Sequence, residues 1–191
     1  MRKWNAKSYV VIGMLSAISY VLMLLDFPLP MFPSFLKVDF SDIPALVASI
    51  ILGPAAGIVV ELLKNVIDFL TTGSETGIPV GHIANFITGI SFIVPAYFLF
   101  AKVKSKKGMA LALGAATLFT AFAMSILNYF VFLPMYAYFL NLQMPANIIV
   151  TAILPFNLVK GIIVSIVFLL LFSKMDHWLR KQQSAFRRAG V

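Results

Sequence analysis

An asparagine and a lysine stand three residues apart in an apolar stretch near the C-terminus and could bind a small polar molecule. They are Asn157 and Lys160 of the segment ILPFNLVKG, and this spacing puts both side chains on one face of a helix. A further amide, Asn128, lies in the apolar segment SILNYFVFLPMY. Amides and an ammonium offer donors and acceptors that suit the edge of a flat polar heterocycle. We therefore expect Asn128, Asn157 and Lys160 to converge on a ligand cavity open to the outside.

A purely structural interpretation of the same three residues stays open. An ionisable group inside a membrane-spanning helix costs about 2.5–3.5 kcal/mol on insertion scales, so Lys160 requires a partner or a function. The partner could be a carboxylate, and Asn128 and Asn157 could tie neighbouring helices together.

A second charged group lies earlier in the chain. Glu61 and Lys64 are spaced i,i+3, and Lys64 and Asp68 are spaced i,i+4. These residues can neutralise one another along a single helix. The alternative is a relay for protons or ions across the membrane.

The segment over residues 26–42, DFPLPMFPSFLKVDFSD, contains three prolines that preclude a plain helix. One interpretation is a solvated connection in which Asp42 caps the next helix. The other is a lid over an outward-facing cavity, which the apolar and aromatic residues of the segment favour. Asn85, near the start of a later apolar stretch, could join such a site, and we expect His82 to lie at the membrane interface.

Composition identifies the elements that must position these residues. Of 191 residues, 61% are hydrophobic and 12% are charged, and the mean hydropathy is +0.96. A soluble domain of this length cannot bury so much apolar surface. Within lipid, backbone groups must be hydrogen-bonded inside their own helix, and a span needs about 20 apolar residues. We therefore predict an all-α integral membrane protein with a six-helix transmembrane bundle.

The predicted spans form one domain that ends in a basic tail. Their approximate bounds are 9–25, 44–53, 55–72, 82–101, 109–133 and 148–173, with the tail at 174–191. A turn at Gly53-Pro54 divides the second apolar region, so residues 44–52 are too short to cross alone and predict a short or re-entrant helix. Residues 134–147 are expected to form a mixed loop because they contain Pro134 and Pro145.

The basic residues predict how the bundle is oriented. Twelve of the fifteen Lys and Arg residues lie in three clusters at the ends of predicted spans. The clusters are Arg2, Lys3 and Lys7; Lys102, Lys104, Lys106 and Lys107; and Lys174, Arg180, Lys181, Arg187 and Arg188. This positive-inside pattern places both termini in the cytoplasm. It accounts for the net charge of +8 without nucleic acid as a partner, and the tail could lie on anionic lipid as an interfacial helix.

Several kinds of chemistry have no residues to support them. The chain has no cysteine and only two histidines, and it contains neither a GxxxxGK phosphate loop nor an HExxH motif. We expect no catalytic residues, no metal ligands and no catalytic cofactor, and any energy for transport must come from another subunit. Gly13 and Ala17 in the first span permit close helix approach, either within the bundle or with a partner.

The sequence resembles a known family over about residues 8–175. The stretch LKVDFSDIPALVASIILGPAAGIVVELLKNVIDFL, together with SILNYFVFLPMY and ILPFNLVKG, is similar to the riboflavin-specific S components (RibU type) of energy-coupling factor (ECF) transporters. The resemblance implies six helices with irregular geometry in the second and third, and a structured outer first loop. It also implies a bacterial cell-membrane protein that binds riboflavin beneath that loop.

The resemblance also assigns roles to residues. It implies that Asn128, Asn157 and Lys160 contact the flavin, and it extends more loosely to three residues at other positions, Asp39, Phe40 and Asn85. It implies a transmembrane coupling subunit and two cytoplasmic ATPase subunits as partners. In that family a small-xxx-small motif on the first helix docks the coupling subunit, and here the motif would be formed by Gly13 and Ala17.

Other functions stay open at the level of sequence. The same architecture could take FMN, FAD or another vitamin, and Lys37 is the clearest basic residue for a phosphate near the outer opening. A stand-alone carrier could couple to protons through Glu61, Lys64 and Asp68. A membrane scaffold would use its polar residues for helix contacts alone, and an enzyme is the poorest match because catalytic groups are missing.

Overall fold

The computed structural model describes residues 4–74, 77–140, 145 and 147–188. Within these ranges the chain is almost entirely helical. The helices are α1 (Ala6–Met23), α2 (Asp42–Leu52), α3 (Pro54–Thr72), α4 (Val80–Lys102), α5 (Lys106–Leu127), α6 (Leu133–Leu140) and α7 (Leu154–Arg188). Two π-helical turns, η1 (Asn128–Phe132) and η2 (Ile149–Ile153), run directly into α6 and α7. Two short strands, β1 (Phe27–Pro28) and β2 (Lys37–Val38), pair antiparallel in the loop between α1 and α2.

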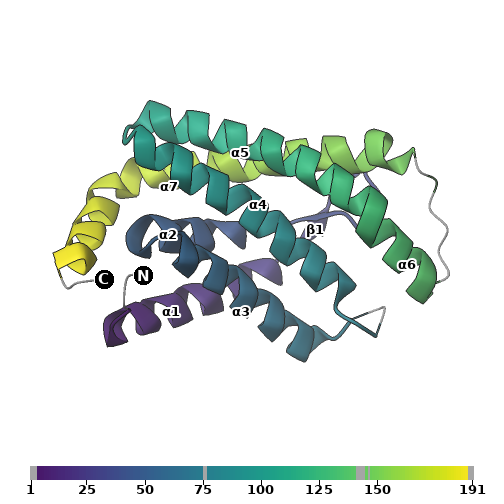
Figure 1. Cartoon of the computed structure of the whole chain (residues 1–191), viewed down its shortest axis with the longest axis horizontal. Helices are drawn as coiled ribbons and strands as arrows, with labels where there is room; N and C mark the ends of the chain where they lie inside the picture. Colours follow the sequence, from purple (N-terminus) through teal and green to yellow (C-terminus); the bar gives the residue numbers. More distant parts are fainter. Residues whose placement is uncertain (1–3, 75–76, 141–144, 146, 189–191) are drawn as a thin grey trace.

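The helices pack side by side as a bundle. α4 lies against α3 and α5, α5 against α7, and the pair α2–α3 against α1, with α2 also contacting α7. In Figure 1 the start of α1, the α4–α5 turn and the end of α7 lie at the left, whereas β1 and α6 lie at the right. The three basic clusters, as far as they are described, therefore share one end of the molecule, and the loop between α1 and α2 lies at the other.

The outward surface of the bundle is apolar, as a membrane protein requires. Large hydrophobic side chains such as Leu111, Phe130 and Leu170 are more than half exposed. Four described helical segments are long and apolar enough to cross a membrane: Ala6–Met23, Val80–Lys102, Lys106–Leu140 and Ile149–Phe186. α2 is shorter, and α3 carries three charged residues. The predicted all-α six-helix membrane fold is confirmed, with α5, η1 and α6 counted as one continuous segment (Lys106–Leu140) and η2 counted with α7.

The break between α2 and α3 confirms the predicted irregularity. Gly53 has a φ of 102°, a left-handed conformation that favours glycine, and Pro54 begins α3. Every residue of α2 is buried, so this short helix is covered by protein, as its length requires. Gly57 lets α3 approach α2 closely, because a Cβ there would lie 2.9 Å from the Ala45 carbonyl oxygen.

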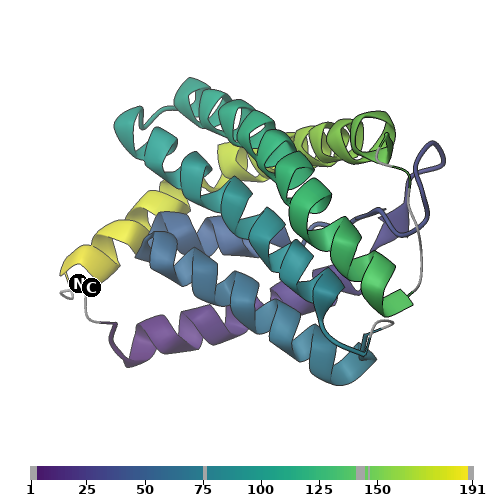
Figure 2. The same cartoon turned by 45° about the vertical axis from the view of Figure 1, so that its right-hand side comes forward.

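Two predictions about the second half of the chain were wrong. Residues 133–140, expected to lie mostly in a loop, form α6, and the wide turn of η1 immediately before Pro134 accommodates the proline. Asn141 and Gln143 of that expected loop lie outside the described residues. The basic tail continues α7 as far as Arg188 instead of forming a separate helix, although its yellow end runs at an angle to the preceding part (Figure 2).

Candidate functional site

Lys160, the most unusual residue of the last apolar stretch, is paired with a carboxylate. Its Nζ lies 2.8 Å from Oδ2 of Asp39, which follows β2 in the loop between α1 and α2. Both residues are buried. A paired charge inside the bundle agrees with the structural interpretation of Lys160. The partner, however, is another of the residues expected at the ligand site.

Burial and charge act on Asp39 in opposite directions. Burial raises the pKa of its carboxyl, but the ammonium groups of Lys160 and Lys64 outweigh burial and hold the pKa well below its usual value. Asp39 is therefore an ionised acceptor at the end of the bundle covered by the α1–α2 loop.

Asn128 and Asn157 each lie at one of the two π-helical turns, and each donates a hydrogen bond to the carbonyl four residues earlier. Asn128 opens η1 and its Nδ2 donates to the Met124 carbonyl at 2.8 Å. Asn157 lies in the first turn of α7, just after η2, and its Nδ2 donates to the Ile153 carbonyl at 2.8 Å. Each amide keeps an oxygen and a second N–H for another partner. Because η1 and η2 contact each other, the two asparagines lie in or just after adjoining turns, and π turns of this kind often occur at functional sites.

A small cavity of about 10 Å³ adjoins this group. It lies between α2, α4, α5 and α7 and is lined by Asp42, Thr88, Thr120, Asn157 and Lys160, among others. The Thr120 hydroxyl is buried with no hydrogen-bond partner among the described residues. A cavity of this size holds about one water. A ring system can enter only if the surrounding side chains move apart.

The second charged group joins the first through the stretch that precedes α2. Lys64 Nζ lies 2.7 Å from Asp42 Oδ1 and 2.8 Å from Glu61 Oε2. It also donates to the Ser41 hydroxyl at 2.6 Å, and the Ser41 N–H donates to Asp39 Oδ1 at 2.9 Å. The Ser41 hydroxyl donates to the same Asp39 oxygen. The result is one buried network of three carboxyl groups and two ammonium groups.

The proposed triad on α3 is therefore only partly correct. Glu61 and Lys64 pair as expected, but Asp68 points elsewhere and contacts His82 Nε2 at 3.0 Å. His82 thus has a carboxylate partner, and its ring also stacks edge-on against Phe69. Asp42 does not cap α2, because Ser41 occupies the N-cap position without a capping bond and Asp42 turns to Lys64. A continuous relay through Glu61, Lys64 and Asp68 is not formed.

Asn85 and Phe40 flank the network. Asn85 accepts a hydrogen bond of 3.3 Å from Asn65, whose amide also donates to the Glu61 carbonyl. Asn85 therefore lies on the Glu61 side of the network, and among the described residues it makes no hydrogen bond to Asn128 or Asn157. Phe40 packs against the main core and lies 6.3 Å from the Phe27 ring. It anchors the loop over this end of the bundle.

The loop between α1 and α2 is held down by contacts that the sequence did not reveal. The Phe32 ring meets Phe156 edge-on, with centroids 5.5 Å apart, directly above the turn that holds Asn157. Lys37 and Asp26 form an exposed ion pair of 3.0 Å beside the β1–β2 pairing. These contacts are of the kind expected of a closed lid. The aromatic richness of residues 26–42 was the one indication in the sequence.

Gly13 and Ala17 lie on the outward face of α1. Both are exposed, whereas Ile12 and Ser16 turn toward the bundle. No described atom lies within 4 Å of a Cβ placed on Gly13. The motif therefore does not mark a helix crossing within this chain, and its small residues are open to a partner or to lipid.

The chain is similar to known transport proteins along most of its length. The family profile described as ECF transporter, substrate-specific component, matches residues 7–172. The chain is 48% identical to the riboflavin transporter FmnP of Bacillus subtilis (strain 168), over 95% of this chain and 98% of FmnP. It is 44% identical to the riboflavin transporter RibU of Staphylococcus aureus (strain TCH60), over 92% of this chain and 93% of RibU.

A solved structure of the S component of a bacterial ECF transporter has the same fold. It superposes with a TM-score of 0.78 at 43% sequence identity and covers 91% of this chain and 97% of that chain. The overall fold of this chain has thus already been seen in an ECF transporter S component. The chain belongs to the family of substrate-specific components of ECF transporters.

Proposed function

We propose that this chain captures riboflavin at the end of the bundle covered by the α1–α2 loop and presents it to an ATP-driven transporter. The observation that carries the proposal is the buried group formed by Lys160, Asp39 and Asn157 beside two adjoining π-helical turns. It is supported by the similarity to two proteins named as riboflavin transporters. Isoalloxazine is a flat polar heterocycle of the kind for which amides and an ammonium are suitable partners.

Binding exchanges internal contacts for contacts to the ligand. The polar edge of the flavin accepts from Lys160 and uses the free oxygens and N–H groups of Asn128 and Asn157. Its ring face stacks on apolar and aromatic side chains such as Phe32 and Phe156. Because the cavity holds about 10 Å³, the loop must lift for the ring to enter and then close over it. This movement breaks the contact between Phe32 and Phe156, and the flavin edge then competes with Asp39 for Lys160.

The transport step requires other subunits. We place the basic end in the cytoplasm by the positive-inside rule, so that the loop faces the outside of a bacterial cell membrane. A transmembrane coupling subunit would dock on the Gly13 and Ala17 face of α1, and two cytoplasmic ATPases would supply the energy. The Ser19 hydroxyl of α1 donates to the Ser41 carbonyl. This bond connects the docking helix to the segment that carries Asp39.

The first test is binding by the purified protein. An absorbance spectrum should show flavin bands when the protein is prepared from cells containing the vitamin. Titration of flavin-free protein should quench riboflavin fluorescence with one site per chain. Competition with FMN and FAD then fixes the preference. A colourless protein that leaves the fluorescence of all three flavins unchanged contradicts the proposal.

A further inference from the structure

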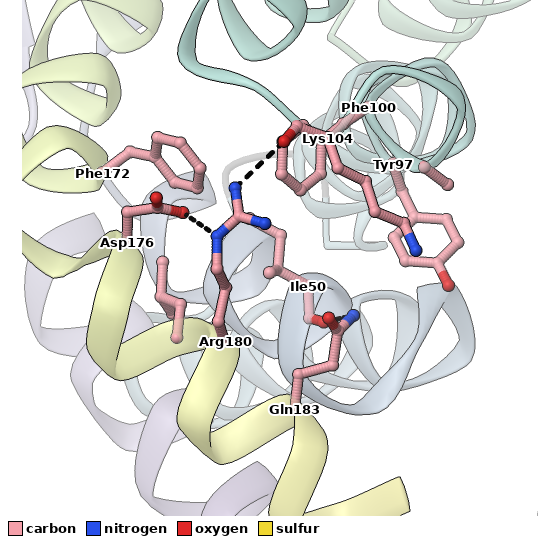
Figure 3. A pocket seen from close by; sticks show the side chains of 10 residues that line it. Ile50, Tyr97, Phe100, Lys104, Phe172, Asp176, Arg180 and Gln183 are labelled. Carbon is pink, nitrogen blue, oxygen red and sulfur yellow. Dashed lines mark hydrogen bonds and ion pairs between the residues drawn. The ribbon is translucent and has the colours of Figure 1, made fainter.

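A second and larger cavity lies at the opposite end of the bundle, among the basic clusters. Its volume is about 230 Å³, which is room for roughly seven waters. It is bordered by the end of α2, the last turns of α4 and the part of α7 that begins the tail (Figure 3). The proposed riboflavin site uses none of the residues that line it.

One side of this cavity carries two cationic side chains. Arg180 donates through Nε to Asp176 Oδ1 at 2.8 Å and through Nη2 to the Lys104 carbonyl at 3.0 Å. Figure 3 shows both bonds holding the guanidinium at the cavity. A guanidinium has five N–H donors, so three remain for another acceptor. With Lys104 also lining the cavity, two cations outnumber the single carboxylate of Asp176.

The rest of the wall is apolar and aromatic. It is formed by Tyr97 and Phe100 of α4 and by Phe172 and Leu179 of α7, and the Phe100 and Phe172 rings meet edge-on at 5.4 Å. Phe98 and Leu171, which neighbour the lining residues Tyr97 and Phe172 in the sequence, are apolar and 55% and 40% exposed. A polar group bound at Arg180 would thus lie next to a surface suited to hydrocarbon.

We propose that this cavity binds the phosphate head group of an anionic membrane lipid, with an acyl chain along the apolar surface beside it. Arginine matches the geometry of a phosphate through paired N–H donors, and the remaining donors of Arg180 are directed by its two fixed bonds. The neighbouring clusters at 102–107 and 174–188 add positive charge at the same end. Basic pockets between transmembrane helices on the cytoplasmic side bind such head groups.

The bound lipid would also strengthen the connections between elements at this end of the bundle. Arg180 connects α7 to the α4–α5 turn through Lys104, and Gln183 donates to the Ile50 carbonyl at 2.8 Å, connecting α7 to α2. A phosphate at Arg180 adds a further shared partner for Lys104 and Arg180. The tail should therefore be fixed against the bundle more firmly in anionic than in zwitterionic lipid.

The test measures lipid bound to the full chain and the stability that the lipid confers. The protein is placed in nanodiscs of phosphatidylcholine with or without phosphatidylglycerol, and retained phosphatidylglycerol is counted by native mass spectrometry. We expect one tightly held phosphatidylglycerol and a higher unfolding temperature in its presence. Lys104→Gln combined with Arg180→Gln should weaken its retention roughly 30-fold. The matched control Lys102→Gln combined with Lys181→Gln removes the same charge outside the cavity lining and should leave retention nearly unchanged.

Three outcomes would overturn the proposal. If both double variants lose phosphatidylglycerol equally, the lipid is attracted to the positive charge of the basic end in general and not to the cavity. Full displacement of the lipid by inorganic phosphate would mean a site for a free phosphate compound. Intact lipid retention in the cavity variant, with loss of binding to a coupling subunit, would mean a protein-docking site. Gel filtration and circular dichroism of both variants establish that they fold, and riboflavin titration of the same samples tests the proposed function separately.

Discussion

Lys160 has one partner in the structure and a second in the proposed complex. The Asp39 carboxylate at 2.8 Å satisfies its charge, and a flavin edge would compete for the same ammonium. Such an exchange keeps the lysine paired in both states, which matters because an unpaired charge in this environment is very unfavourable. A residue with this arrangement can contribute to affinity without destabilising the empty site.

Replacing Lys160 with methionine should therefore weaken riboflavin binding. A hydrogen bond to a charged group contributes about 1.5–3 kcal/mol, so we expect affinity to fall roughly 10- to 150-fold. Fluorescence quenching of purified protein measures the change. Lys102→Met, at the opposite end, is the matched control and should bind normally. Equal affinity in the two variants would remove Lys160 from the site.

Lys64 has a structural role that its sequence context only partly indicated. It is fully buried and contacts Asp42, Glu61 and Ser41. Its removal would leave two carboxyl groups of the network without their nearest cation. Lys37, in contrast, forms an exposed pair with Asp26.

Lys64→Met should accordingly reduce the free energy of unfolding by about 3–5 kcal/mol, as expected for a broken buried ion pair. Lys37→Met should change it by less than about 1 kcal/mol, because exposed pairs contribute little. Thermal unfolding of both variants in the same lipid tests the difference. Similar unfolding temperatures would mean that the network does not stabilise the bundle.

At the scale of elements, the α1–α2 loop is the part that must move. Phe32 contacts α7 through the ring of Phe156, in addition to the pair between Asp39 and Lys160. Met31, the preceding residue, is 92% exposed. The two neighbours thus differ in whether they hold the loop against the site.

Phe32→Ala should speed riboflavin release. An aromatic pair contributes about 0.5–1.5 kcal/mol beyond its buried area, so the dissociation rate should rise roughly 3- to 10-fold. Stopped-flow fluorescence after dilution measures this rate. Met31→Ala should leave it unchanged, and an unchanged rate in both variants would mean that the loop does not limit release.

The sequence predicted these elements unevenly, for physical reasons. Hydropathy and the positions of the charged residues were sufficient to predict the membrane fold. The predicted turn at Gly53-Pro54 correctly divided α2 from α3. The expectation that a loop begins at Pro134 was wrong, because a π-helical turn before this proline lets the helix continue. No periodicity of side chains indicates such a turn in advance.

The sequence predicted which residues belong to the candidate site but not which of them contact one another. Asn128, Asn157 and Lys160 were selected because polar residues in apolar helices are rare. The pairing of Lys160 with Asp39 joins residues 121 positions apart, and no local spacing can reveal it. The same limit explains why Asp68 was grouped with Lys64 instead of His82, since i,i+4 spacing permits a contact but does not require it.

On the scale of the whole molecule, the functional parts lie apart and are connected by α1. The candidate ligand site lies under the loop, and the basic clusters lie at the opposite end (Figure 1). The small residues of α1 are exposed. The Ser19 hydroxyl donates to the Ser41 carbonyl, next to the Asp39 that holds Lys160. A partner bound on the outer face of α1 is thus one hydrogen bond away from the segment that closes the site.

This arrangement predicts that docking and riboflavin binding can be separated by one substitution. Gly13→Leu fills the outward face of α1, where close approach of a partner helix needs a small residue. Association with the coupling subunit should weaken about tenfold, and ATP-driven uptake should fall with it. Riboflavin affinity of the isolated chain should stay unchanged, because Gly13 has no described neighbour within 4 Å of its side-chain position.

Gly114→Leu on α5 is the matched control, because it adds the same side chain at another open, exposed glycine. Co-purification with the coupling subunit and uptake into ATP-loaded vesicles should both be normal for this variant. If Gly13→Leu and Gly114→Leu assemble equally well, the coupling subunit does not use the outer face of α1. If Gly13→Leu instead loses riboflavin binding in the isolated chain, α1 acts on the site through Ser19 and Ser41, and docking cannot be the only function of that face.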